Sequence, residues 1–198
     1  MDILNRTYTT AEIAELVGVS VKDLANWADR GLIRPVNESI GRGRSREYSW
    51  FTLIQIACGV AIMELGFSSP KEALAAALRF AHISSGGSGW VGSEQEGQPI
   101  RYPGLPFHHM RGVTMFYVSG ERGAVLLHRI WDKELFSDGH FKLERLLNGA
   151  RGYIALNVSE IFEDLCARLG EDYRNVLDRA YAGKDEAVNW TAAGGPKD

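Results

Sequence analysis

Thr9-Thr10-Ala11-Glu12-Ile13-Ala14-Glu15-Leu16-Val17-Gly18-Val19-Ser20 contains the start of one helix, its end, and the start of the next. Thr9 and Glu12 have the spacing of a capping box, and the apolar residues after them recur at i, i+3 and i+4. Gly18 ends the helix, because glycine readily adopts the left-handed conformation that follows a last turn. Ser20 is a natural N-cap. The stretch therefore predicts two helices joined by a tight turn.

The second helix is predicted over residues 21–30, with Val21, Leu24 and Ala28 facing inward and Gly31 as its stop. Two short helices joined in this way form a helix-turn-helix candidate. In such a unit the second helix enters the major groove and uses outward side chains near its N-terminus. Those side chains are here Lys22, Asp23, Asn26 and Trp27.

Gly41-Arg42-Gly43-Arg44-Ser45-Arg46-Glu47-Tyr48 lies downstream, and its arginines alternate with small residues. This alternation predicts a two-stranded loop, a wing, that presents cations on one side. An ordinary solvated loop is the alternative. The position beside a helix-turn-helix favours DNA, and arginines on such a loop contact phosphate or the minor groove more often than they read bases.

Two further helices are predicted after the wing. Ser49 caps the first, over residues 50–65, which is apolar almost all round and is therefore expected to be buried on more than one side. Ser69-Pro70-Lys71-Glu72 combines capping-box spacing with a proline at the first helical position, which predicts a helix over residues 70–82.

The remaining sequence has a different pattern. Residues 113–119 and 124–131 are β-like runs separated by a glycine-containing turn, which predicts a hairpin, and residues 153–158 predict a third strand. Residues 140–147 fit either a strand or a helix. Ser159 is expected to cap a helix whose apolar stripe continues past Gly170.

The chain is thus predicted to be α+β. We expect a four-helix winged helix-turn-helix DNA-binding domain over residues 1–83 and a Gly/Ser/Pro-rich linker over 84–106. A small α+β dimerisation or sensing domain follows over residues 107–183, and a disordered tail over 184–198.

Two patterns in the C-terminal domain suggest a role for it. A stripe at heptad-like spacing fits a dimer seam, although packing on the domain's own sheet is slightly favoured; it consists of Phe162, Cys166, Leu169, Tyr173, Val176 and Ala180. A set of aromatic residues could hold a small apolar ligand, by analogy at the level of the fold; it consists of Phe107, Phe116, Tyr117 and Trp131.

Composition restricts the function class. The 198 residues are 45% hydrophobic and carry a net charge of -3, so a DNA contact has to come from the distribution of charge and not from its sum. Cys58 and Cys166 lie in apolar surroundings without ligand spacing, which is typical of a reducing compartment. The N-terminus lacks signal-peptide order, and the longest apolar run, residues 53–65, is too short to span a bilayer. A cytoplasmic protein without a membrane partner is expected.

The chemistry-bearing motifs of enzymes are missing from the sequence. There is no Walker loop, no GxSxG and no dinucleotide-binding fingerprint, so an enzyme is not expected. The histidines have neither HxxxH nor HExxH spacing, which favours structural or surface roles over a metal site, and no cofactor is expected; they are His82, His108, His109, His128 and His140.

About the first 80 of the 198 residues resemble the MerR-type winged helix. Residues 8–20 are similar to its opening, residues 24–33 to its second helix and exit, and Arg46-Glu47-Tyr48 to the Arg-x-Tyr of its wing. The resemblance implies winged-helix DNA binding, a homodimer on a two-fold site, and transcriptional control. The resemblance and the places of the residues on the predicted second helix and wing together suggest a set of DNA-binding residues. The set consists of Lys22, Asn26, Trp27, Arg34, Arg42, Arg44, Arg46 and Tyr48.

The chain also departs from the family. Ala25 stands where members usually have an arginine that contacts DNA, and Asn26 replaces the usual aromatic residue. A typical member continues into a long coiled-coil helix, whereas residues 84–89 here are glycine and serine. Excisionases share the same winged-helix core. A phage-type excisionase or a packaging or architectural DNA-binding factor, and a protein-interaction module on this scaffold, are therefore the alternative functions.

Overall fold

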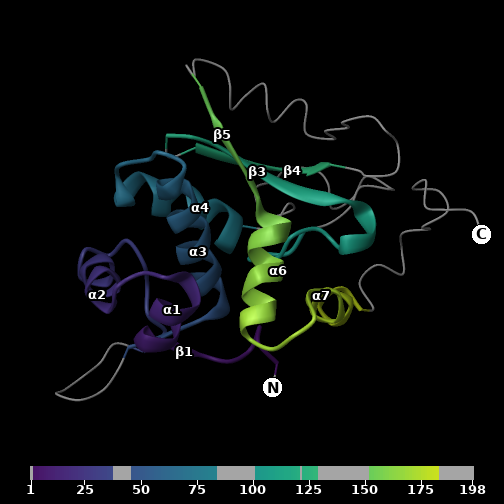
Figure 1. The fold of residues 1–198 in the computed structure, drawn as a ribbon, viewed down its shortest axis with the longest axis horizontal. Coiled ribbons are helices and arrows are strands. Elements are labelled where there is room, and N and C mark those ends of the chain that lie inside the picture. Colours follow the sequence, from purple (N-terminus) through teal and green to yellow (C-terminus); the bar gives the residue numbers. More distant parts are fainter. Residues whose placement is uncertain (1, 38–45, 84–100, 121, 129–151, 183–198) are drawn as a thin grey trace, which may run out of the picture.

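The computed structural model describes residues 2–37, 46–83, 101–120, 122–128 and 152–182. In this part the chain is α+β, as predicted (Figure 1). The helices are α1 (Thr10–Val17), α2 (Val21–Asp29), α3 (Trp50–Glu64), α4 (Pro70–His82), α6 (Val158–Arg168) and α7 (Tyr173–Tyr181), with a short 3-10 helix η1 (His109–Arg111). The strands are β1 (Tyr8–Thr9), β2 (Glu47–Tyr48), β3 (Val113–Ser119), β4 (Arg122–His128) and β5 (Ile154–Asn157).

The turn between α1 and α2 follows the local sequence signals. The Glu12 amide donates to Thr9 Oγ1 over 3.3 Å, and the Thr9 amide donates to Glu12 Oε2 over 2.7 Å, which completes the capping box. Gly18 has φ 76° at the end of α1, and Ser20 caps α2. The prediction for Val21 was wrong: its side chain is 52% exposed, because it lies one turn before Leu24, the first residue of α2 that reaches the core.

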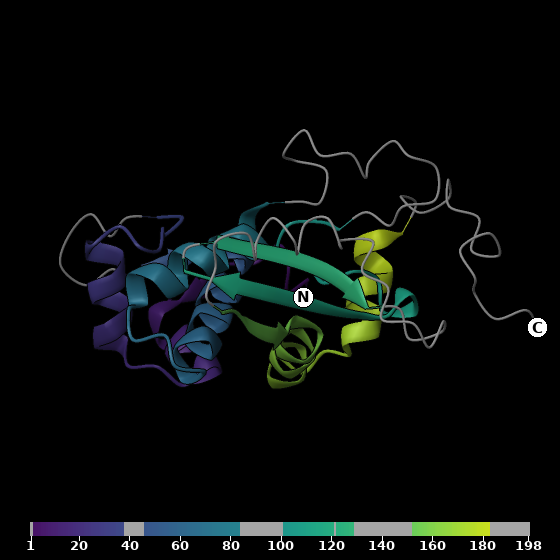
Figure 2. The same ribbon diagram turned by 90° about the horizontal axis from the view of Figure 1, so that it is seen from above.

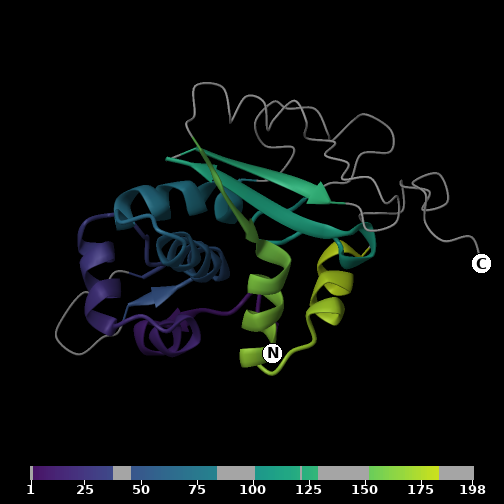
Figure 3. The same ribbon diagram turned by 45° about the horizontal axis from the view of Figure 1, so that its top comes forward.

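Helix α3 lies at the centre of the molecule and is buried on more than one side, as predicted. Figure 3 shows α1 on one side of it and α6 on the other, and α4 lies along it. Gly59 allows α3 and α4 to approach closely, since a Cβ at this position would lie 2.6 Å from Leu74 Cδ2. The apolar sequence of α3 is therefore covered on most of its surface, although Phe51 is 39% exposed.

The second sheet has the order β4-β3-β5, with both pairs antiparallel. Ser119 pairs with Arg122 across a tight turn at Gly120, which confirms the predicted hairpin. Along β3, Thr114, Phe116 and Val118 are buried and alternate with half-buried neighbours, the period of a strand with one covered face. Residues 129–131 and 140–147 lie outside the described residues.

The C-terminal helices correct two expectations. Asn157, not Ser159, caps α6; Ser159 Oγ instead accepts a hydrogen bond of 2.9 Å from the Thr114 amide and so ties α6 to β3. The apolar stripe does not run along one helix either, because Gly170 (φ 75°) separates α6 from α7. Phe162, Cys166 and Val176 are buried within the chain itself, so the stripe packs intramolecularly.

The N-terminal and C-terminal halves share one apolar core. The Trp50 ring meets Phe162 edge to face with centroids 5.6 Å apart, and Phe80 meets Phe116 with centroids 6.0 Å apart. Residues 101–106, at the end of the predicted linker, are packed here too, and Arg101 is only 2% exposed. The domain boundaries stay a prediction, and residues 84–100 and the tail from 183 lie outside the described residues.

No helix among the described residues is long and apolar enough to cross a membrane. Seen from above in Figure 2, α2 lies toward one end of the molecule and α7 toward the other. Helix α2 is therefore well separated from α7, whereas α6 lies between them, with Arg168 donating to the Leu16 carbonyl over 3.2 Å.

Candidate nucleic-acid interface

The exposed face of α2 carries two of the predicted DNA-binding residues. Lys22 and Asn26 are both solvent-exposed, while Leu24 and Trp27 turn into the core. Asp23 is exposed as well, and its carboxylate accepts a hydrogen bond of 2.6 Å from Ser20 Oγ at the cap of the helix. The structure thus leaves Lys22 and Asn26 available at the N-terminal half of α2.

Trp27 and Tyr48 are placed by packing. Both side chains are buried, and Tyr48 lies in β2, directly paired with Tyr8 of β1. Burial raises the pKa of Tyr48, although the hydroxyl of Thr10 and the charge of Arg46 oppose this shift. These two aromatic residues hold the helix and the end of the loop in position, and little of either side chain is accessible to a partner.

The predicted wing is closed at its base. Asn37 and Glu47 form an antiparallel bridge, and the Val36 amide donates to the Glu47 carbonyl over 2.7 Å. Arg34, just before this bridge, is exposed, and its carbonyl accepts a hydrogen bond from Thr52 Oγ1 over 3.1 Å. Arg42 and Arg44 fall in residues 38–45, which lie outside the described residues.

Arg46 connects the end of this loop to α2. Its Nη2 lies 2.5 Å from Asp29 Oδ1, and its Nη1 lies 3.4 Å from the Ala25 carbonyl. The hydrogen bond from Arg46 to Asp29 raises the pKa of the guanidinium further. Because exposed ion pairs of this kind contribute about 0 to 1 kcal/mol, a phosphate group can compete with Asp29 for this cation. The sequence pattern identified Arg46 but gave no sign of its partner, which lies 17 residues away.

The charge of this face is mixed. Lys22 on α2 and Arg30 at its C-cap are exposed, but so are Asp23 and Asp29. Ala25, where the family has an arginine, is half-buried against the Arg46 guanidinium. Among the described residues, positive charge outside α2 is supplied near this surface by Arg34 and Arg46.

The predicted ligand-binding aromatics among the described residues do not line the cavity described below. Phe107 and Phe116 are buried, Tyr117 is half-buried in β3, and Trp131 lies outside the described residues. A cavity of about 480 Å³ occurs elsewhere, between the N-terminal segment, the start of α3 and α7. Its lining residues include Leu4, Trp50, Phe51, Tyr102, Leu105 and Val176. A small-molecule ligand stays a prediction.

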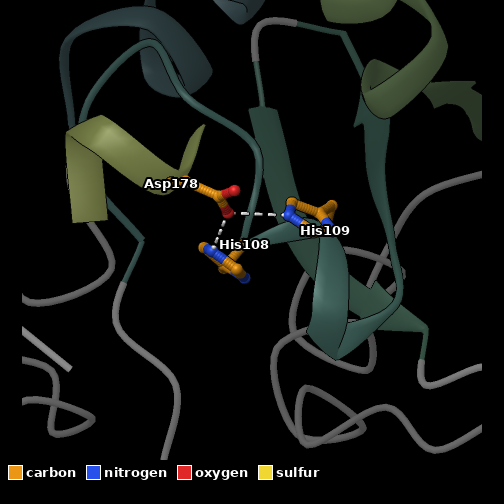
Figure 4. A group of neighbouring side chains, drawn as sticks. All are labelled: His108, His109 and Asp178. Atoms are coloured by element: carbon orange, nitrogen blue, oxygen red, sulfur yellow. Dashed lines mark hydrogen bonds and ion pairs between the residues drawn. The ribbon is translucent and has the colours of Figure 1, made fainter. Parts of the chain in front are cut away.

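A second polar cluster lies away from this face. His108 and His109, at η1, meet Asp178 of α7 (Figure 4). The sequence did not predict this cluster, because the two histidines and the aspartate are about 70 residues apart in the chain.

No curated protein matches this chain at a significant level. A family model described as "MerR HTH family regulatory protein" matches residues 8–57. The matched segment runs from β1 through α1, α2 and the predicted wing into the first half of α3. It covers residues 8–20, 24–33 and 46–48, which carry the resemblance, but ends before the fourth helix, to which the resemblance was expected to extend. The match indicates a DNA-binding regulator. Residues 8–57 of the chain thus resemble the helix-turn-helix segment of the MerR family of regulators.

Proposed function

We propose that this chain is a sequence-specific DNA-binding transcriptional regulator of MerR-like type that binds a two-fold DNA site as a homodimer. The observation that carries the proposal is the contact of Arg46 with Asp29 and the Ala25 carbonyl. This contact fixes the end of the arginine-containing loop beside α2. The helix and the loop can then approach one duplex together, as the helix and wing of a winged helix do.

The side chains divide into two roles in this proposal. Lys22 and Asn26 enter the major groove from α2, where an Asn side chain can pair with both edge atoms of adenine. Arg34, Arg42, Arg44 and Arg46 contact phosphates and supply most of the electrostatic binding. Trp27 and Tyr48 act through the packing that positions these groups.

The dimer has to form differently from that of a typical relative. Helix α4 ends at His82, and Ile83 has an extended backbone (φ -117°, ψ 126°), so the helix does not continue directly into a coiled coil. The C-terminal part packs on α3 instead, which supports a dimer contact made by other surfaces. A two-fold DNA site then requires these surfaces to set the distance between the two helices α2.

Replacement of Arg42, Arg44 and Arg46 by alanine is expected to weaken DNA binding by about 100-fold or more at near-physiological salt. The binding site is first selected from genomic fragments with the purified protein, and affinity is then measured by fluorescence anisotropy over a range of salt. If all three side chains contact phosphates, the slope of log affinity against log salt falls by about three.

A triple variant at Arg79, Arg174 and Arg179 is the matched control. These arginines are exposed on α4 and α7, so their replacement by alanine removes the same charge away from the proposed interface. Circular dichroism checks that both variants remain folded. Equal affinity of the loop variant and the wild-type protein, at the same salt, would contradict the proposal.

A protein-interaction module is the second candidate, and the acidic residues of α2 favour it. Asp23 and Asp29 are exposed, Arg46 is paired with Asp29, and Ala25 cannot contact a phosphate. Failure to select any DNA sequence would support this candidate. Selection of several adjacent, regularly spaced sites in place of one two-fold site would support an architectural factor.

A further inference from the structure

Two neighbouring histidines and one aspartate converge on a single point at the end of the molecule opposite α2. His108 Nε2 lies 2.9 Å and His109 Nε2 lies 2.8 Å from the same oxygen, Asp178 Oδ1 (Figure 4). One nitrogen of each histidine and one oxygen of the aspartate all lie within 4.8 Å of one another. Among the described residues, this is the group of side chains whose donor atoms suit a metal ion.

The surrounding residues hold the cluster in place. The imidazole rings of His108 and His109 are stacked with centroids 4.4 Å apart. Tyr181 lies edge-on to His108, and Tyr173 lies edge-on to His109. The Tyr181 hydroxyl donates to the Pro106 carbonyl over 2.7 Å, which fastens α7 to the segment that leads into the histidines. Ligands held in this way lose little freedom when an ion binds.

The protonation states also suit a metal. Burial tends to raise the pKa of the Asp178 carboxyl, but hydrogen bonds and charge from His109 and His108 outweigh it and hold that pKa below its usual value. The carboxylate is therefore ionised at neutral pH, as a ligand must be. In the metal-free protein each histidine can donate an Nε2–H to Asp178 Oδ1.

We propose that His108 Nε2, His109 Nε2 and the Asp178 carboxylate bind one divalent transition-metal ion of the zinc class, with water in the fourth position. Bonds of about 2.0 to 2.1 Å in tetrahedral geometry place ligand atoms about 3.3 Å apart. The Asp178 oxygen, at 2.8 to 2.9 Å from the two nitrogens, therefore has to move back by about half an ångström, and the two histidine nitrogens, which lie within 4.8 Å of each other, have to reach the same spacing. The Asp178 side chain is 54% exposed, which leaves it free to move and leaves the fourth position open to solvent.

The donor set decides the class of ion. Two imidazole nitrogens and one carboxylate suit zinc and its neighbours in the transition series, whereas calcium and magnesium prefer oxygen alone, and copper(I) prefers sulfur. A histidine that binds the ion through Nε2 carries its ring proton on Nδ1. For His108 this ends the contact of Nδ1 with the Met110 amide, which at 3.4 Å is too long to oppose binding strongly.

An ion at this position would link η1 to α7, two segments about 70 residues apart in the chain. It would stabilise the C-terminal part of the fold and would not take part in DNA contact, since α2 lies toward the other end of the molecule. The inference therefore goes beyond the proposed function and does not depend on it.

Calorimetric titration of the tag-free full chain with Zn²⁺ tests the proposal, and Co²⁺ reports the coordination geometry by its visible absorption. We expect one ion per chain and a higher melting temperature with metal. Asp178→Asn is expected to weaken binding by about tenfold or more, since loss of an outer-shell partner alone costs about 10- to 100-fold. An Asn oxygen can still accept hydrogen bonds from the histidines, so this change separates metal binding from simple hydrogen bonding.

Asp164→Asn is the matched control, because it makes the same chemical change at an exposed position of α6. It is expected to bind Zn²⁺ like the wild-type protein. Binding that is lost in Asp178→Asn and in His109→Ala, but kept in the control, supports the site. Absence of Zn²⁺ and Co²⁺ binding to the wild-type chain would overturn it, as would equal binding by Asp178→Asn; the cluster would then be a hydrogen-bonded link only.

Discussion

Replacement of Trp50 by alanine is expected to lower the free energy of unfolding by about 3 to 5 kcal/mol, as for other large aromatic residues removed from a core. Trp50 is 1% exposed and stands at the first position of α3. Its ring packs edge to face on Phe162, and its indole N–H donates to the Gly104 carbonyl over 3.0 Å. The substitution thus removes apolar contacts and leaves a buried carbonyl without this donor. Urea unfolding followed by circular dichroism measures the effect.

Phe51→Ala is the control for this change, because Phe51 is the next residue and is 39% exposed. Phe51→Ala is expected to lower the free energy of unfolding by less than half as much as Trp50→Ala. Trp50→Phe separates the two contributions, since it keeps a ring and removes the hydrogen bond, with an expected loss of about 1 kcal/mol from the bond. If Trp50→Ala lowers the free energy of unfolding by no more than Phe51→Ala does, the result would contradict a core shared by α3 and α6.

Replacement of Arg101 by methionine is expected to destabilise the protein by about 3 kcal/mol or more, because several buried carbonyls lose a charged donor. Arg101 Nη1 donates to the carbonyls of Phe80 and Tyr102 over 3.0 Å and of Leu105 over 3.2 Å, and Nη2 donates to Ile83. Burial lowers the pKa of Arg101 to about 10, so the guanidinium is still charged at neutral pH. The cation also lies at the C-terminus of α4, where the helix dipole favours positive charge.

Arg79→Met provides the comparison, because Arg79 is exposed on the same helix and its replacement is expected to change stability by about 0.5 kcal/mol at most. Arg101→Lys is expected to fall between the two variants, since an ammonium has fewer donors and lacks the planar fork of a guanidinium. Denaturant unfolding of the three variants gives these values. A stability of Arg101→Met within about 1 kcal/mol of the wild-type protein would mean that water replaces the guanidinium.

The sequence predicted the elements whose causes are local. Thr9, Ser20, Ser49 and Ser69 were identified as N-caps, and each one accepts a hydrogen bond from a backbone amide three residues later. A cap works over one turn of chain, so its residues are adjacent in the sequence. The hairpin at Gly120 was predicted for the same reason, because the turn and the flanking strands lie within one short stretch.

Features that depend on distant contacts were not predictable in this way. Serine is a common N-cap, but Ser159 Oγ accepts a hydrogen bond from the Thr114 amide of the neighbouring strand β3. Asn157 caps the helix instead. Arg101 lies in a stretch with the composition of a linker, yet it is buried because α4 offers it free carbonyls. In both cases a partner from another part of the chain decides the outcome.

The same limit applies to the sites. The arginine loop could be recognised from a pattern within eight residues, and the match of residues 8–57 to a MerR-type model confirms the resemblance of this segment. Asp29 as the partner of Arg46, and Asp178 as the partner of two histidines, depend on how helices are placed in space. No spacing rule applied to a single sequence could have identified them.

The contact of Trp50 with Phe162 also bears on how this chain can change during evolution. In a modular regulator, a DNA-binding head can be joined to a new partner domain without alteration. Here a chain ending near residue 83 would leave one side of Trp50 and of Phe80 uncovered, because Phe162 of α6 and Phe116 of β3 pack on them. The head could not be exchanged alone, and substitutions on either side of this contact would have to be matched by substitutions on the other.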